Sequence, residues 1–319
     1  MDDKQKLIER IIELTGWPNV DRVDILTDTS DCMRIKRGDI LRVEGHDYVI
    51  KGNKYETRFG IEYQPKYWVL SALDMETGDD KIIKTVFYED FHVHIGVFKM
   101  HCYRSPDKEA DVLNLVRGDK RFMQGFPALD DKGNNVRIIE YIRGETIFNY
   151  VYKIDKTHEE YFHTDLPVIL HKLLGCFEAI NFLHENKTCH GDIRNDHIII
   201  EEGTGEYRWI DFDLNQHISD FDVWSTGNII NYAVGKGINS FPNIIKDKNI
   251  SAEIKDSLNR DDASVFYEYR LMNLQKLYPY IPPMLSNILK HFTAKPIAVY
   301  TSMPELIKEY KEMLVKEFN

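Results

Sequence analysis

Apolar and polar residues follow two different periods along this chain. Between about residues 35 and 142, short apolar runs are separated by turn-forming residues, a pattern that predicts an antiparallel sheet. The predicted strands cover residues 40–43, 48–50, 67–73, 81–87 and 136–141. One helical pattern, at residues 107–116, interrupts these strands.

After residue 145 the apolar spacing becomes helical. Residues 166–183 carry one apolar face at helical spacing, and residues 222–234, 253–291 and 304–317 show the same period. An amphipathic helix is also predicted at residues 4–15. A β-rich part followed by an α-rich part predicts an α+β, bilobal fold, with a small antiparallel β lobe and a larger, mainly α-helical lobe.

Three segments follow from this change of pattern. We expect an N-terminal extension with an amphipathic helix at residues 1–45, an N-lobe at 46–142 and a C-lobe at 143–319. The chain has 319 residues, of which 43% are hydrophobic, and this is enough to form one hydrophobic core in each lobe. A cleft between two lobes is a common place for a ligand to bind, so we expect the functional site there.

The overall charge and the cysteines narrow the functional classes. The net charge is −11 and the chain has no dense Lys/Arg run, so we expect no nucleic-acid partner. The N-terminus has no apolar signal region, and no apolar run approaches the roughly 18 residues of a membrane span, so we expect no membrane association. The four cysteines are far apart in sequence. We therefore expect a reduced, cytoplasmic protein.

Two acidic strings stand where rigid elements end. His190-Gly191-Asp192 directly follows the predicted long helix and places an acid on a loop. Nineteen residues later, a short apolar strand ends in Asp211 and Asp213. Paired carboxylates at a strand end are plausible Mg²⁺ ligands, because Mg²⁺ prefers oxygen donors. A solvated turn is the alternative interpretation of the second string.

Two further charged positions stand in structured contexts. Lys84 lies at the end of an apolar strand, where an unpaired charge is costly, and Glu109 on the next helix is its natural partner. A solvated surface pair is the simpler alternative. Asp222 opens a predicted helix, where it can cap that helix or accept hydrogen bonds from the backbone of a neighbouring loop.

Taken in order, these elements resemble the protein kinase fold between about residues 48 and 235. His190-Gly191-Asp192 resembles the catalytic His-Arg-Asp motif, and Asp211-Phe212-Asp213 resembles Asp-Phe-Gly. The other matching parts are the strand lysine Lys84, its helix partner Glu109, the hinge at 139–144 and the core helix that begins at Asp222. Each motif is weak alone, but their order along the chain indicates the protein-kinase-like superfamily.

The resemblance implies a role for each acidic and basic residue. Lys84 would hold the α and β phosphates of ATP, and Glu109 would orient this lysine. Asp211 would bind Mg²⁺. Asp192 would orient the acceptor hydroxyl and take its proton, while Arg194 would neutralise the transferring phosphate. The adenine base would contact backbone groups of the hinge, at Glu140 and Ile142.

The chain departs from the family in its phosphate loop and its second metal ligand. Residues 60–69 keep only one glycine, so few backbone N–H groups can approach phosphate closely. His197 occupies the position of the second metal-binding asparagine, and imidazole suits Zn²⁺ or Mn²⁺ better than Mg²⁺. Asp213 or Asp196 is a possible source of a replacement oxygen.

Two other departures concern the acceptor. Gly191 replaces the arginine of His-Arg-Asp, as in aminoglycoside phosphotransferases and other small-molecule kinases. Only residues 214–221 separate Asp213 from Asp222, which is too short for a peptide-docking activation segment. The sequence therefore predicts an ATP-dependent phosphotransferase, with a protein serine/threonine acceptor ahead of a small-molecule hydroxyl. The contrasting hypothesis is an ATP-binding pseudokinase that acts as a scaffold.

Overall fold

The computed structural model divides the chain into two compact units. One comprises residues 1–89 and 104–142, and the other comprises residues 90–103 and 143–319. The structure describes residues 3–18, 20, 22–58, 61–95, 98–216, 221–296 and 298–318. The predicted α+β class, with a smaller sheet-based lobe and a larger helical lobe, is confirmed.

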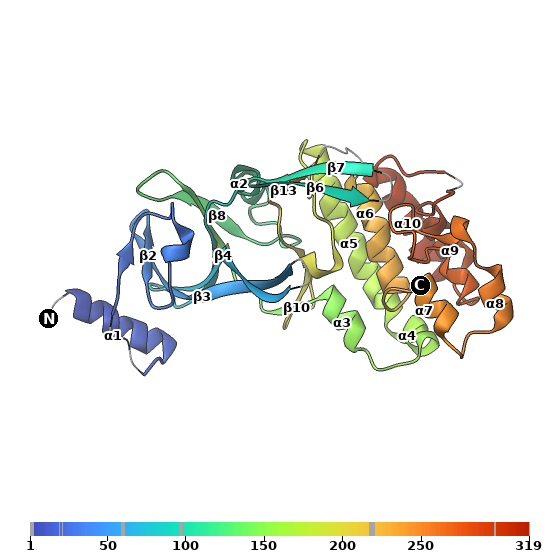
Figure 1. The fold of residues 1–319 in the computed structure, drawn as a ribbon, viewed down its shortest axis with the longest axis horizontal. Coiled ribbons are helices and arrows are strands. Elements are labelled where there is room, and N and C mark those ends of the chain that lie inside the picture. Colours follow the sequence, from blue (N-terminus) through green and yellow to red (C-terminus); the bar gives the residue numbers. More distant parts are fainter. Residues whose placement is uncertain are drawn as a thin grey trace. The chain divides into compact units, whose positions relative to one another are not determined.

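A seven-stranded sheet forms the first unit (Figure 1). Its strand order is β1-β2-β3-β4-β5-β9-β8, and its neighbours pair antiparallel except for β1 with β2. The strands are β1 (Ile25–Leu26), β2 (Ile40–Val43), β3 (His46–Arg58), β4 (Ile61–Asp74), β5 (Asp80–Lys84), β8 (Gly125–Leu129) and β9 (Asn135–Glu140). Strand β5 ends at Lys84, so the prediction that it continues to residue 87 was wrong. It lies between β4 and β9 in the sheet.

Two helices accompany this sheet. Helix α1 (Asp3–Thr15) buries Ile11 in a core cluster with Val23, Ile40 and Val49, which shows that its apolar stripe is used for packing. Helix α2 (Pro106–Leu115) begins after Ser105, whose hydroxyl accepts a hydrogen bond from the backbone N–H of Lys108. This cap fixes the start of the helix that carries Glu109.

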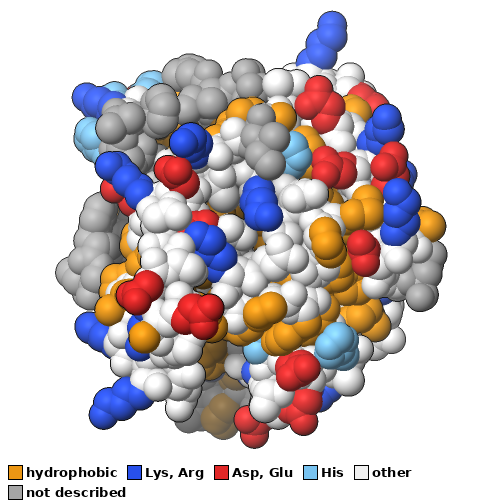
Figure 2. Space-filling view, turned by 90° about the vertical axis from the view of Figure 1, so that its right-hand side faces the viewer, with side chains coloured by type: hydrophobic (Ala, Val, Ile, Leu, Met, Phe, Trp, Pro, Cys, Tyr) orange, Lys and Arg blue, Asp and Glu red, His pale blue; other side chains and the backbone are white. Residues whose placement is uncertain are grey.

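The second unit is mainly helical. Its helices are α3 (Ile147–Lys153), α4 (His158–Thr164), α5 (Leu166–Glu185), α6 (Phe221–Val234), α7 (Phe241–Lys246), α8 (Ala252–Ser257), α9 (Pro283–Lys290) and α10 (Met303–Glu317). Helix α5 contacts α4, α6, α10 and β12 (Tyr207–Trp209). Figure 2 shows a face on which acidic and basic side chains are interspersed around a hydrophobic area.

Helix α5 also has the length and hydropathy of a membrane-spanning helix, which the sequence analysis did not expect. Half of its apolar window is buried inside the protein, and nine of its side chains are in the core. The core helix of a soluble domain passes the same test. Trp209 Nε1 donates to the Cys176 carbonyl at 3.0 Å, and Tyr310 Oη donates to the Leu170 carbonyl at 3.0 Å, so two packed aromatics are tied to the α5 backbone.

The long helical pattern predicted for residues 253–291 was wrong. Only α8 and α9 form within it as α-helices in the described structure, joined by irregular chain and short 3₁₀ turns. Leu258 is extended, and Asn259 caps a 3₁₀ turn through its side chain, so the first helix cannot continue. Pro282 and Pro283 then set the start of α9.

Two small sheets complete the second unit. The first has the order β10-β11-β12, with β10 at Gly144–Thr146 and β11 at Ile198–Glu201. The second joins β13 (Leu214–Gln216) to the hairpin formed by β6 (Glu89–Ile95) and β7 (Phe98–Arg104). The sequence analysis missed this hairpin. Its strand β7 pairs with β13, the segment that directly follows Asp213.

Candidate functional site

A buried charge cluster in the first unit contains Lys84 and Glu109. Lys84 Nζ lies 2.6 Å from Glu109 Oε1, and both side chains are buried. The predicted pairing of these residues is therefore present, and the surface-pair alternative is wrong. Glu109 Oε2 also lies 3.3 Å from Nε of Arg137, which is buried on β9. Glu109 is thus a carboxylate shared by two buried cations.

The hinge residues end the first unit. The backbone N–H of Glu140 donates to the Gln124 carbonyl at 2.9 Å, and its side chain accepts from the Gln124 N–H at 2.9 Å. The N–H group and the carboxylate of Glu140 are therefore both engaged within the first unit. Ile142 is the last residue of this unit. Both adenine contacts remain predictions.

In the second unit, Asp222 fixes the loop that carries Asp192. Its carboxylate accepts hydrogen bonds from the backbone N–H groups of His190, at 2.7 Å, and Gly191, at 2.9 Å. His184 Nε2 lies 3.0 Å from the same carboxylate. Asp222 therefore binds the neighbouring loop, one of the two roles that the sequence allowed. Burial alone raises the pKa of Asp222, but the hydrogen bond from His184, the charges of His190 and His184 and the Gly191 N–H outweigh it and hold the pKa below its usual value.

Two residues of this region have left-handed backbone. Gly191 has φ +85°, a conformation that glycine adopts at little cost, which gives a physical reason for glycine before Asp192. Asp211 has φ +65°, which is uncommon for a residue with a side chain. Strained backbone of this kind is concentrated at functional sites.

The imidazole of His197 lies between Asp192 and Asp211. His197 Nδ1 is 2.8 Å from the carbonyl oxygen of Asp192 and 3.8 Å from Asp192 Oδ2, whereas Nε2 is 3.6 Å from Asp211 Oδ2. The two acidic motifs, 19 residues apart in sequence, are therefore brought to the same buried ring. Neighbouring Asp192, Arg194 forms a two-pronged ion pair with Asp196.

The metal-binding capacity of the region around Asp211 depends on which side chains are grouped there. Within the described ranges, no cluster of three or more His, Cys, Asp or Glu side chains is arranged to hold a metal ion. The donors that fit best are His197 Nε2 and Asp211 Oδ2, two groups on either side of one gap. Such a site suits an ion that takes its other ligands from phosphates and water, as Mg²⁺ commonly does. Asp213 is buried and is not brought into a three-ligand group with them. Asp196 is engaged by Arg194, which weakens it as a source of a replacement oxygen.

The pKa of the Asp196 carboxyl is set by opposing effects, of which burial is the one that raises it. The hydrogen bond from Arg194, the charge of His197 and the charge of Arg194 outweigh burial, so that the pKa lies below its usual value. The Arg194–Asp196 pair is therefore ionised at neutral pH.

Two predicted features lie partly outside the described residues. The stretch with a single glycine includes Gly60, which is outside them, whereas the following strand, β4, is described from Ile61 onward. Residues 217–220 of the short segment before α6 are also outside them. The described part of that segment, β13, is paired with β7.

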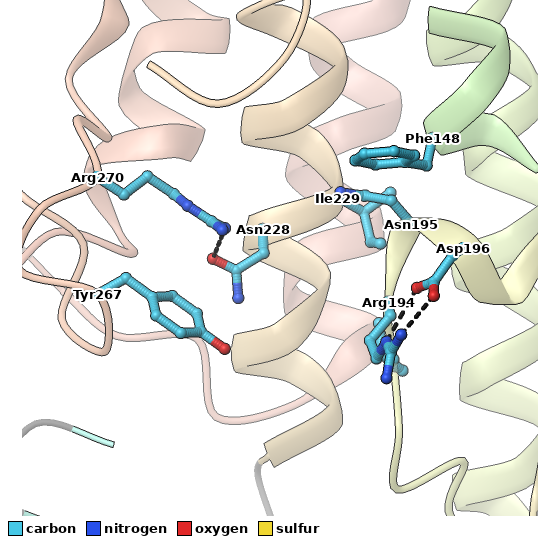
Figure 3. Close-up of a pocket in the computed structure, with 9 residues that line it drawn as sticks. Phe148, Arg194, Asn195, Asp196, Asn228, Ile229, Tyr267 and Arg270 are labelled. Carbon is cyan, nitrogen blue, oxygen red and sulfur yellow. Dashed lines mark hydrogen bonds and ion pairs between the residues drawn. The ribbon is translucent and has the colours of Figure 1, made fainter. Parts of the chain in front are cut away.

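A cavity of about 300 Å³ lies beside the Asp192 loop in the second unit (Figure 3). Its lining residues are Phe148, Ile193, Arg194, Asn195, Asp196, Asn228, Ile229, Tyr267 and Arg270. Residues 193–196 follow Asp192 directly along the chain, so the cavity adjoins the predicted catalytic loop.

The sequence analysis missed three buried arginines, Arg137, Arg208 and Arg270. Arg137 stands in an apolar strand, in the same context that identified Lys84, so the same reasoning could have found it. Arg270 lies in irregular chain, where no local pattern indicates burial.

Comparison with known proteins gives one partial similarity. No family model matches the chain. Over 87 residues it is 36% identical to the EKC/KEOPS complex subunit bud32 of Dictyostelium discoideum. The matched part is 27% of this chain and 32% of that protein, so the chain spans about a third of this relative's length. The similarity supports the protein-kinase-like superfamily, and at that coarse level it supports kinase character and ATP binding.

Proposed function

We propose that this protein is an ATP-dependent phosphotransferase that acts on a hydroxyl group. The observation that carries this proposal is the position of His197 between Asp192 and Asp211 on a loop fixed by Asp222. Phosphoryl transfer depends mainly on positioning and charge neutralisation, and these side chains supply both.

In the proposed reaction, the acceptor hydroxyl oxygen attacks the γ-phosphorus of ATP. The bond between this phosphorus and the β–γ bridging oxygen breaks, which gives a phosphate monoester and ADP. Asp192 orients the hydroxyl and accepts its proton, which then passes to solvent. Lys84 binds the α and β phosphates, and Glu109 holds this lysine in place.

His197 and Asp211 would hold the divalent cation, which supplies charge neutralisation for the phosphates when bound. The soft imidazole donor favours Mn²⁺ over Mg²⁺ at this position. We propose that Arg194 neutralises the transferring phosphate. The proposed location of the reaction is the cytoplasm.

The acceptor is proposed from two features of the second unit. Residues 214–221 are too few for a peptide-docking segment, and a cavity adjoins residues 193–196. These features favour a small-molecule hydroxyl over the protein serine/threonine hydroxyl that the sequence placed first. A pseudokinase scaffold is the second candidate, because His197 replaces the family's asparagine.

ATP turnover with Mg²⁺ and with Mn²⁺ tests the proposal. We expect ADP formation by the wild-type chain and strongly reduced formation by Asp192→Asn. Asp261→Asn is the matched control, since Asp261 is exposed and far along the chain from the motifs. Mass spectrometry of the protein would detect autophosphorylation. Metal-dependent nucleotide binding without turnover by any of the three proteins would favour the pseudokinase.

A further inference from the structure

Arg270 is a buried cation on the wall of the cavity beside the Asp192 loop. Its side chain is 8% exposed, and Nη1 donates to Asn228 Oδ1 at 2.8 Å. Its Nε is buried and has no hydrogen-bond partner in the described part of the chain. No carboxylate among the described residues forms an ion pair with it. Within the described structure, the guanidinium is therefore buried without a carboxylate to neutralise its charge, and its Nε–H group lacks a hydrogen-bond acceptor.

Its surroundings compensate this charge only in part. The guanidinium carbon lies 4.7 Å from the centroid of the Tyr267 ring, which gives a cation–π contact. The other arginine of the cavity, Arg194, is neutralised by Asp196. The lining consequently carries an excess positive charge at Arg270. A buried charge without a partner is costly, and an anion bound in the cavity would remove that cost.

The cavity is also built to hydrogen-bond a polar ligand. Asn195 Oδ1 is buried and has no hydrogen-bond partner among the residues that the structure describes, and it belongs to the loop that follows Asp192. In Figure 3, Arg270 and Tyr267 extend from one side toward Asn228 on α6, and the Arg194–Asp196 pair stands on the other side. Phe148 and Ile229 add apolar wall. A volume of about 300 Å³ suits a small molecule.

We propose that this cavity binds the acceptor, and that the acceptor is a small hydroxylated anion, a phosphate or carboxylate, whose anionic group is held by Arg270. This inference rests on the proposed phosphotransferase function and names its substrate class. The ligand's hydroxyl end would lie toward residues 193–196, next to Asp192. Cationic acceptors such as aminoglycosides are disfavoured, because Arg270 repels them.

Binding of four ligands with one carbon skeleton tests the charge preference directly. Calorimetry of the full chain, without ATP or metal, would compare glycerol, glycerol 3-phosphate, glycerate and 3-amino-1,2-propanediol. We expect the two anions to bind at least about tenfold more tightly than the neutral and cationic ligands, because charge-assisted hydrogen bonds are stronger than neutral ones. The two anions separate a phosphate requirement from a carboxylate requirement. Equal affinity for all four ligands, or binding of none, would overturn the proposal.

Three variants locate the site. Arg270→Gln should lower the affinity for the preferred anion about tenfold or more. Arg260→Gln is the matched control, because Arg260 is exposed and paired with Glu268, and it should keep wild-type affinity. Asn228→Asp places a carboxylate where Arg270 already donates, so it should raise the melting temperature and also abolish anion binding. A protein that becomes more stable while losing the anion cannot be explained by misfolding. Retained affinity in Arg270→Gln or Asn228→Asp would overturn the assignment.

The outcome is separable from the proposed function. Anion binding is measured without nucleotide, so its result does not depend on whether the protein transfers phosphate. If the wild-type chain forms no ADP with any acceptor, the phosphotransferase proposal fails, whatever the anion affinity. If glycerol 3-phosphate and glycerate bind at Arg270 but a serine peptide alone is phosphorylated, the cavity is not the acceptor site and this inference is wrong.

Discussion

His197 Nε2 lies 3.6 Å from Asp211 Oδ2. The other ring nitrogen, Nδ1, faces the Asp192 carbonyl oxygen at 2.8 Å, so Nδ1 must carry a proton, because a carbonyl can only accept. In the neutral ring, Nε2 then carries a lone pair on the side of Asp211. A separation of 3.6 Å is too long for a hydrogen bond, but it is short enough for one cation to contact both atoms.

This arrangement predicts a change of metal preference in His197→Asn. The substitution replaces a nitrogen donor with an amide oxygen, which Mg²⁺ prefers. We expect the ratio of Mn²⁺-supported to Mg²⁺-supported ATP turnover to fall about tenfold, a typical effect of altering a metal site. His46→Asn is the control, since His46 is exposed and lies in the other unit. An unchanged ratio would remove His197 from the set of metal ligands.

The Glu109 cluster predicts an order of stability losses. Glu109→Gln leaves Lys84 and Arg137 buried without their shared carboxylate, and we expect it to lower the free energy of unfolding by about 3–5 kcal/mol. Lys84→Met removes one cation and leaves Arg137 paired, so it should cost less. Urea unfolding measures both effects.

Lys84→Met should nevertheless weaken nucleotide binding strongly, because the proposed phosphate-binding cation is removed. Lys153→Met is its control, since Lys153 forms an exposed pair with Glu145. Unchanged nucleotide affinity and turnover in Lys84→Met would rule out the phosphate-binding role. A larger stability loss for Lys84→Met than for Glu109→Gln would contradict the shared-carboxylate interpretation.

The lowered pKa of Asp222 predicts a loss of stability in acid. The ordinary value is 3.8, and the folded pKa lies below it. Between these values the unfolded chain binds more protons, so the stabilisation is complete above pH 3.8 and is lost as the pH falls through the folded pKa. Asp222→Asn should be less stable at pH 7, and its free energy of unfolding should fall less steeply below about pH 4. Asp261→Asn should keep the wild-type slope, and an equally steep slope in Asp222→Asn would contradict this assignment.

Local pattern predicted much of this fold. The period-2 runs located β2 and β9, and the apolar stripe located α5 within two residues of its end, because these elements bury one face or both. The Lys84–Glu109 pair was also predictable, since a charge in an apolar strand needs a partner. The hairpin formed by β6 and β7 was missed although its sequence alternates: His92 and His94 fall between apolar residues, as does His101, which is a period-2 strand pattern.

Long-range packing explains what the sequence could not predict. Glycine is required at position 227 for a spatial reason: a Cβ there would lie 2.4 Å from the Phe292 ring, 65 positions away in sequence. Arg270 reaches Asn228 from irregular chain in the same way. Such contacts depend on how the helices pack, and no periodicity within either segment encodes them.

The different positions of Asp192 and Asp211 predict different kinetic defects. Asp211 has a left-handed backbone and faces the lone-pair side of His197, which suits a metal ligand. Asp192 lies on the loop held by Asp222 and directly before the residues that line the cavity, which suits contact with an acceptor hydroxyl. Asp192→Asn should therefore keep nucleotide affinity and lower transfer, because an amide cannot accept the proton. Asp211→Asn should also weaken metal-dependent nucleotide binding, because it removes a charged ligand.

Titration of each variant with nucleotide, with and without Mn²⁺, separates the two roles from a general loss of structure. Single-turnover rates at saturating ATP then isolate the transfer step from binding. We expect about a hundredfold or greater loss of transfer in Asp192→Asn, within the range attributed to general base catalysis. The metal-dependent gain in nucleotide affinity should persist in Asp192→Asn and disappear in Asp211→Asn. Full transfer activity in Asp192→Asn would remove the catalytic role, and an identical metal response in both variants would show that the assignment of base and ligand is wrong.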